Sequence, residues 1–210
     1  MVNEGSITGI FPTPIYRTEM SRGWTEEEKK VWQDCDWHRS IGNSTSSDVY
    51  ILDRLPELKE SVESVIGDYW NKVITTVNSV SPVLTQSWLN RTGVGDYHHR
   101  HNHSNSLISG VVYLETDSDT ITFFREDRNL LSLTVENYHL FNSPSWVFSV
   151  KSGDIILFPS DLHHMVDEKV SGQDRISLAF NVWVKGSIGV KEDMTELTIG
   201  PEFKHLRKIA

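Results

Sequence analysis

The sequence predicts a mainly β, α+β fold in which two helices precede an antiparallel sandwich or barrel. Helical signals are confined to the part of the chain before Pro82. After Pro82, short segments rich in β-branched and aromatic residues follow one another, with turn residues between them. Many strands without interleaved helices indicate an antiparallel architecture, and helices grouped ahead of the strands indicate an α+β layout.

Bulk composition is that of a globular protein, with 210 residues, 38% of them apolar and 23% charged. A chain of this length can bury its core as one domain, so we expect a single domain over residues 1–210. The formal net charge of −9 argues against a general nucleic-acid binder, which concentrates Lys and Arg on one face.

The compartment follows from cysteine usage and from the N-terminal region. Cys35 is the only cysteine, so no intrachain disulfide can form and a reducing compartment fits best. The first residues lack the basic-then-apolar layout of a signal peptide, and no apolar run approaches about 18 residues. We expect a cytoplasmic protein without membrane contact.

Two helices are predicted before the strands. The first begins at Thr25 and runs to about Asp36, because Thr25 followed three residues later by Glu28 forms a capping-box pattern. The second follows Asp53 as its cap and covers residues 54–79, where apolar residues recur at spacings of three and four up to Val77. This apolar stripe predicts a helix that packs against a sheet.

Six strands are predicted after Pro82, at residues 83–89, 107–115, 120–125, 146–150, 154–159 and 175–184. Gly- and Asp-rich turns separate them, and the end of the chain from Gly186 onward is expected to wrap the surface. Residues 126–141 and 37–48 have the character of variable lid loops, which often carry substrate recognition.

Most of the histidines fall in two short stretches, one before the predicted strand at residues 107–115 and one after the predicted strand at residues 154–159. Six of the nine fall in two groups: His98, His99, His101 and His103, then His163 and His164. On a strand, residues i and i+2 point to one face, so His101 and His103 can share a metal. A distal histidine would complete a three-ligand site with open positions, although imidazole alone does not select the metal.

An arginine on the last long strand suggests an anion site beside the metal. Arg175 and Ser177 share one face of the strand at residues 175–184, together with Ala179. An inward guanidinium is costly unless it meets an anion, and its planar fork is suited to a carboxylate. The alternative is an edge-strand arginine that points to solvent.

These motifs, in this order, resemble the 2-oxoglutarate/Fe(II)-dependent oxygenase superfamily, and most closely its phage and bacterial subgroup of oxygenases without an assigned substrate. The resemblance spans residues 83–184, and more weakly residues 8–16 with Phe11-Pro12-Thr13-Pro14. The matching pieces are Ser87-Trp88-Leu89-Asn90, Gly95-Asp96-Tyr97, His101-Asn102-His103, residues 107–114, Gly153-Asp154 with the strand up to Ser160, His164, and residues 175–181.

The resemblance implies a double-stranded β-helix, or jelly roll, buttressed by helices. It places His101 as the first iron ligand, His103 where the family has Asp or Glu, and His164 as the distal ligand. His163 competes with His164, which is preferred because the family's ligand lies five residues after the proline that is Pro159 here. Arg175 would bind the distal carboxylate of 2-oxoglutarate with help from Ser177, and Tyr113 and Asn90 would line the same pocket.

The implied activity is a dioxygenase reaction that uses Fe(II), 2-oxoglutarate and O₂. It would hydroxylate a C–H bond of an unidentified peptide or small molecule and release succinate and CO₂. Because His103 replaces the acid, the site is one negative charge short, which should weaken iron retention or admit another metal. The oligomeric state stays open, with a homodimer among the options.

Three other readings are compatible with parts of the sequence. A cupin-like metal protein would use the three histidines without 2-oxoglutarate and would have no need for Arg175. A zinc hydrolase would need a general base, and only Asp96, Asp161 and Asp167 lie near the histidines. A non-catalytic jelly-roll module would tolerate the loss of His101.

Overall fold

The computed structural model describes residues 5–117, 119–126 and 133–200, and it contains two antiparallel sheets. The larger sheet has the strand order β1-β9-β6-β11-β4-β3-β2, with β12 paired to β11, and the smaller one has the order β5-β10-β7-β8. The larger sheet consists of β1 (Tyr16–Glu19), β9 (Asp154–Pro159), β6 (Ile108–Glu115), β11 (Arg175–Ile188), β4 (Val80–Thr92), β3 (Ser44–Ser46), β2 (Trp37–Arg39) and β12 (Leu197–Ile199). The smaller sheet consists of β5 (His98–His101), β10 (His164–Val166), β7 (Asp119–Phe124) and β8 (Ser145–Val150).

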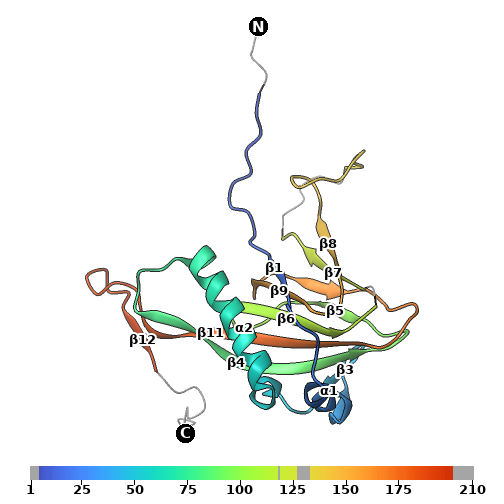
Figure 1. Cartoon of the computed structure of the whole chain (residues 1–210). Coiled ribbons are helices and arrows are strands. Elements are labelled where there is room, and N and C mark those ends of the chain that lie inside the picture. Colours follow the sequence, from blue (N-terminus) through green and yellow to red (C-terminus); the bar gives the residue numbers. More distant parts are fainter. Residues whose placement is uncertain (1–4, 118, 127–132, 201–210) are drawn as a thin grey trace.

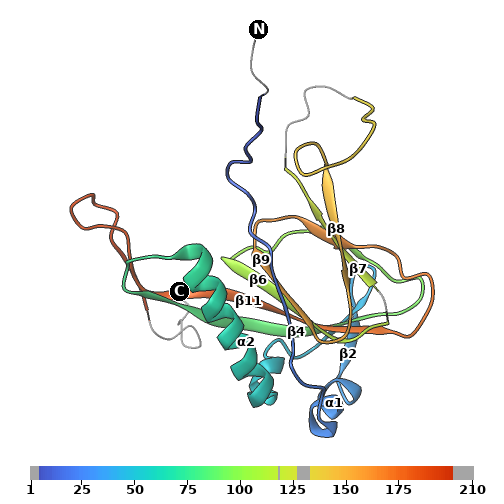
Figure 2. The same ribbon diagram turned by 45° about the horizontal axis from the view of Figure 1, so that its top comes forward.

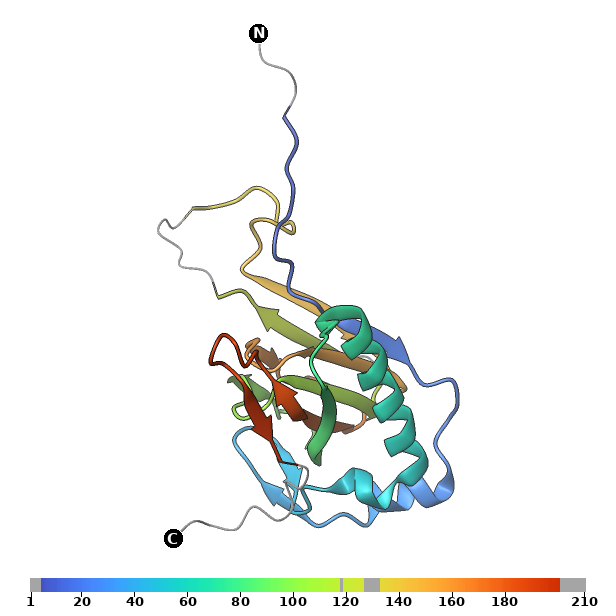
Figure 3. The same ribbon diagram turned by 90° about the vertical axis from the view of Figure 1, so that its left-hand side faces the viewer.

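Both α-helices precede β4, but they do not precede every strand, because β1 lies before the first of them, and β2 and β3 lie between the two. Helix α1 (Glu26–Gln33) has the predicted capping box, with Thr25 and Glu28 bonded reciprocally. Helix α2 (Pro56–Tyr69) lies along the outer face of the larger sheet (Figures 1 and 3). Leu58, Val62 and Ile66 of α2 are buried in one core cluster with strand residues such as Leu178.

The second helix differs from the prediction at both ends. Asp53 is not its cap, because it belongs to a short 3₁₀ helix, Ile51–Arg54, and α2 begins after Leu55 with Pro56 in the first turn. Proline fits there because the first helical N–H groups have no partner to lose. The helix passes into a π turn, Trp70–Ile74, and stops at Thr75 in the left-handed region, so Val77 is fully exposed outside the helix.

Among the described residues, six strands lie outside the predicted ranges: β1, β2, β3, β5, β10 and β12. Residues 37–48, expected as a lid loop, instead contain β2 and β3, which pair with each other and join the sheet beside β4. The segment after Gly186 does not simply wrap the surface, because β11 continues to Ile188 and pairs with β12. The other predicted lid, residues 126–141, lies partly outside the described residues.

Side chains along the central strands alternate between two regions, the core under α2 and the space between the two sheets. Even-numbered residues of β11, such as Leu178 and Phe180, pack toward α2. Odd-numbered residues, including Arg175 and Ser177, line the space between the two sheets. This double layer (Figure 2) is a jelly roll, as predicted, and it leaves one polar stripe on the inner face of an otherwise apolar sheet.

Among the described residues, no helix is long and apolar enough to cross a membrane.

Candidate metal centre

Three histidines from two neighbouring strands meet between the sheets. His101 ends β5, and His164 begins β10 directly opposite it in the strand register. His103 lies just beyond β5 rather than within a strand, and its backbone N–H donates to the carbonyl of Ser160 at 2.8 Å. The i, i+2 spacing therefore brings the two rings to one side through an anchored turn.

The geometry of this triad would allow it to hold a metal ion. One ligand nitrogen from each of His101, His103 and His164 can be chosen so that all three lie within 4.8 Å of one another. The ring centroids of His101 and His164 are 4.4 Å apart, and those of His103 and His164 are 5.2 Å apart. Nitrogen ligands about 2.1 Å from a common ion require this kind of convergence.

Hydrogen bonds at Nδ1 leave Nε2 of each ring available. Nδ1 of His101 lies 2.7 Å from the carbonyl oxygen of His99, and Nδ1 of His164 lies 3.0 Å from that of Leu162. Nδ1 of His103 lies 2.7 Å from Oδ1 of Asn181. These oxygens only accept, so each Nδ1 carries the proton and each Nε2 keeps a lone pair that can bind a metal.

Burial keeps the three imidazole rings of the triad uncharged. Desolvation is the main cause that lowers the pKa of His101 to about 4 and that of His164 to about 2, and it also lowers the pKa of His103. The neighbouring imidazoles lower the His101 and His164 values further. At neutral pH the rings are therefore neutral, which is the form that binds metals.

Arg175 lies on the inner face of the same double layer and is only 2% exposed. Its Nη2 donates to Oγ1 of Thr92 at 2.9 Å, whereas Nε and Nη1 have no hydrogen-bond partner among the described residues. Burial lowers the pKa of its guanidinium. A buried cation with two orphan donors is costly unless an anion meets it, which is the pattern expected of a carboxylate clamp.

The other predicted cofactor residues form one row across three strands. Ser177 on β11 lies opposite Asn90 on β4 and opposite Tyr113 on β6. All three are at most 5% exposed, and Oδ1 of Asn90 has no partner. Burial raises the pKa of Tyr113, so its hydroxyl stays a hydrogen-bond donor.

These residues and the triad line a common cavity of about 50 Å³. That is the space of one or two water molecules, so a five-carbon dicarboxylate can enter only if lining side chains move. His98 is one such side chain, because its ring lines the cavity and stacks on His101 at 4.3 Å. The donor set and the orphan polar atoms fit a metal and a carboxylate, whereas the cavity in this conformation is tight.

The structure separates the two adjacent histidines. The His164 ring belongs to the triad, whereas Nδ1 of His163 lies against the carboxylate of Glu126 and its side chain is 32% exposed. Every residue predicted for the site lines the common cavity. Sequence reasoning missed His98 and Asn181, although Asn181 continues the alternation that begins at Arg175 and Ser177.

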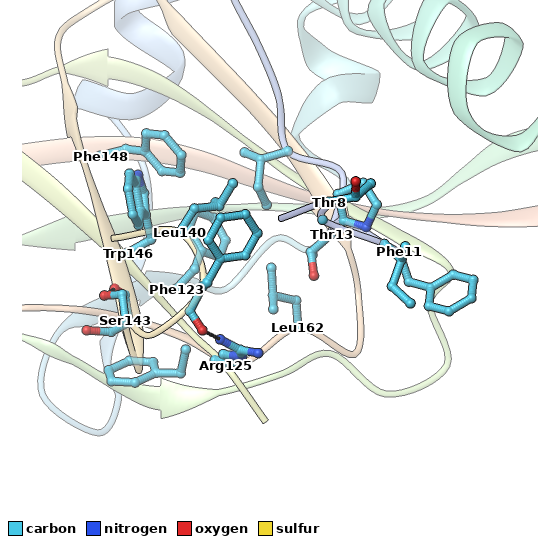
Figure 4. A pocket seen from close by; sticks show the side chains of 17 residues that line it. Thr8, Phe11, Thr13, Phe123, Arg125, Leu140, Ser143, Trp146, Phe148 and Leu162 are labelled. Atoms are coloured by element: carbon cyan, nitrogen blue, oxygen red, sulfur yellow. Dashed lines mark hydrogen bonds between the residues drawn. The ribbon is translucent and has the colours of Figure 1, made fainter. Parts of the chain in front are cut away.

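A second, larger cavity adjoins the triad on the side of the smaller sheet. Its volume is about 600 Å³, and it lies between the extended residues 8–15 and the segment 140–148 (Figure 4). Its walls include Phe123, Trp146, Phe148 and Leu162. The Phe123 ring centroid is 6.0 Å from that of His164, so this wall of the larger cavity lies beside the triad.

One family model matches part of the chain. Residues 86–181 match the model described as "Putative 2OG-Fe(II) oxygenase", which covers somewhat less than half of the chain. No curated protein matches the sequence.

Solved structures share the fold at low sequence identity. An oxidoreductase of the 2OG-Fe(II) oxygenase family from Burkholderia pseudomallei is 13% identical, with a TM-score of 0.53 and coverage of 73% of this chain and 74% of that chain. HygX from Streptomyces hygroscopicus, with nickel, 2-oxoglutarate and hygromycin B bound, is 14% identical, with a TM-score of 0.54 and coverage of 81% and 82%. SnoK, a non-heme α-ketoglutarate-dependent carbocyclase from nogalamycin biosynthesis, is 13% identical, with a TM-score of 0.56 and coverage of 83% and 81%.

Residues 86–181 are thus similar to the 2OG-Fe(II) oxygenase family model, and the chain shares the jelly-roll fold of solved 2-oxoglutarate-dependent oxygenases.

Proposed function

We propose that the chain is an Fe(II)- and 2-oxoglutarate-dependent oxygenase that hydroxylates a C–H bond of a substrate still to be identified. One observation carries this proposal: three imidazoles with free Nε2 atoms and a buried guanidinium with two orphan donors line one cavity. A metal protein that did not use a dicarboxylate would have no reason to bury Arg175 unpaired.

In this proposal His101, His103 and His164 hold the metal. The guanidinium of Arg175 takes the distal carboxylate of 2-oxoglutarate, and the hydroxyls of Ser177 and Tyr113 add hydrogen bonds. When bound, Fe(II) and 2-oxoglutarate supply O₂-dependent oxidation coupled to formation of succinate and CO₂. The protein orients both groups and excludes water from them.

The apolar cavity of Figure 4 is the proposed approach for the substrate. Its wall residue Phe123 has its ring centroid 6.0 Å from that of His164, and among the residues that the structure describes no Asp or Glu lines it. Its volume of about 600 Å³ is that of a typical small-molecule pocket. These features support a largely apolar portion of the substrate lying beside the metal.

Calorimetric titration of 2-oxoglutarate into the Ni(II)-loaded protein tests the proposal. We expect binding only when metal is present, and we expect Arg175→Met to weaken it about 100-fold, because charge-assisted hydrogen bonds in a buried site are lost. Arg91→Met is the matched control, since the Arg91 side chain is 43% exposed. Equal affinities for the wild type and Arg175→Met would rule out the clamp.

A further inference from the structure

His103 is held differently from the other two histidines of the triad. His101 and His164 donate Nδ1–H to backbone carbonyls, which no substitution removes. Nδ1 of His103 instead faces two side chains, at 2.7 Å from Oδ1 of Asn181 and 3.0 Å from Oγ of Ser109. The one imidazole that stands where the family has a carboxylate therefore depends on neighbouring side chains for its orientation.

The strand register places these two side chains under the ring. Asn181 on β11 and Ser109 on β6 are Cα partners across the centre of the larger sheet. Both point into the space between the sheets, where Asn181 is 7% exposed and Ser109 is fully buried. Oγ of Ser109 also donates to Oδ1 of Asn181 at 2.9 Å, so two donors converge on one amide oxygen.

Behind Ser109, two further serine side chains extend this set of polar contacts as far as a backbone carbonyl. Oγ of Ser160 lies 2.8 Å from that of Ser109 and 2.7 Å from that of Ser106, and its single proton is donated to one of the two. Ser106 in turn donates to the carbonyl of Ile108 at 3.0 Å. Among the described residues, no buried side-chain atom of this network lacks a partner. Buried hydroxyls and amides cost stability unless they are satisfied, so these contacts hold the Asn181 and Ser109 side chains in place behind His103.

We propose that Asn181, supported by Ser109, is a positioning residue that fixes His103 as the Nδ1–H tautomer and aims its Nε2 at the metal. The proposal rests on the proposed function for the identity of the metal site. An amide oxygen only accepts, so a bare Nδ1 at 2.7 Å would face another lone pair. Because the amide is neutral, the network orients the ring without restoring the missing negative charge.

The amide explains how an imidazole can serve in the carboxylate's place. A ligating histidine needs an acceptor on its other nitrogen to fix its tautomer and its ring plane. Without Asn181 the His103 ring could flip or present Nε2–H to the metal, which would abolish its donor lone pair. The ability of His103 to bind a metal therefore depends on the side chain at position 181.

Metal titration of four variants tests this role without 2-oxoglutarate or turnover. Asn181→Leu should weaken Ni(II) binding about 10- to 100-fold, as is usual when the acceptor behind a metal-bound histidine is lost. Asn181→Asp retains the acceptor and should bind Ni(II) at least as tightly as the wild type. Ser109→Ala should lose less than Asn181→Leu. Ser87→Ala removes an equally buried hydroxyl that accepts from the Leu52 backbone N–H, and it should bind like the wild type.

A nitrogen–proton correlation spectrum of the Zn(II)-loaded protein provides a readout independent of affinity. It should show His103 protonated at Nδ1 in the wild type and in Asn181→Asp. The inference is overturned if Asn181→Leu binds Ni(II) like the wild type, if Asn181→Asp is as weak as Asn181→Leu, or if His103 carries its proton on Nε2. If Asn181→Leu does not fold, the Ni(II) affinity of Asn181→Asp and the His103 tautomer in the spectrum still test the inference. Tight Ni(II) binding without any 2-oxoglutarate binding would contradict the proposed function but not the role of Asn181 in positioning His103.

Discussion

At the scale of single residues, two adjacent histidines have different surroundings and different proposed roles. His164 begins β10 with its ring toward His101, whereas His163 pairs with Glu126 on the other side. His164→Ala should therefore abolish Ni(II) binding, because two imidazoles remain where three converge. His163→Ala should change the affinity less than twofold. Calorimetry of both variants checks this, and a comparable loss in each would mean that the third ligand is misassigned.

The seven residues proposed from sequence for the site each lie in a short motif, and the structure brings them to one cavity. His101 and His103 share an H-x-H pattern, and Arg175 and Ser177 share an alternating strand. Asn181 and Ser109 could not be predicted as partners of His103, because their contact depends on the pairing of β6 with β11. Position 103 lies outside any strand, so strand periodicity alone does not explain where its ring points.

At the scale of elements, the capping box of α1 was predictable from four consecutive residues. The backbone N–H of Glu28 donates to Oγ1 of Thr25 at 3.2 Å, and the backbone N–H of Thr25 donates to Glu28 at 2.9 Å. Thr25→Ala should lower the free energy of unfolding by about 1 kcal/mol, because one N-terminal N–H loses its acceptor. Urea denaturation of the metal-free protein checks this value, and an unchanged midpoint would contradict it.

Glu28 gives the same element a pH dependence. Hydrogen bonding to Arg22 is the first cause that holds the pKa of this buried carboxyl below its ordinary value of 4.5. A depressed pKa in the folded state gives stability that is fully present above the unfolded pKa and is lost as pH falls through the folded pKa. Glu28→Gln should therefore be less stable than the wild type at pH 7, and the difference should shrink below about pH 4. A difference that grows toward low pH would exclude this assignment.

Prediction failed at α2 because local sequence signals and packing disagree there. Asp53 is an acceptable cap by residue type, yet the 3₁₀ turn that contains it buries Ile51 and Leu52 and moves the helix start to Pro56. The apolar spacing continues to Val77, whereas the helix stops where Thr75 enters the left-handed region. The short strands β2 and β3 were missed because three-residue strands at a sheet edge carry too few residues for an alternation signal.

At the scale of the whole molecule, a metal held by the triad should stabilise the folded state, because its ligands come from segments that are brought together only by the pairing of β5 with β10. The triad joins the region after β5 to the start of β10, and the serine network under His103 joins both to the larger sheet. A metal that binds only the folded state stabilises it by about 2.7 kcal/mol when its concentration is 100 times Kd. The wild type should therefore show a higher Tm with Ni(II) than without, and His164→Ala should show no such increase. Equal shifts in both proteins would place the metal elsewhere.

The most direct test of the central claim is an anaerobic titration of the metal-free protein with Fe(II) and then with 2-oxoglutarate, followed in the visible range. A weak metal-to-ligand charge-transfer band arises only when 2-oxoglutarate binds the iron itself. The account predicts this band in the wild type, its appearance at much higher 2-oxoglutarate concentration in Arg175→Met, and its absence in His164→Ala. Iron binding without any band at saturating 2-oxoglutarate would contradict the claim that the triad and Arg175 form one oxygenase site.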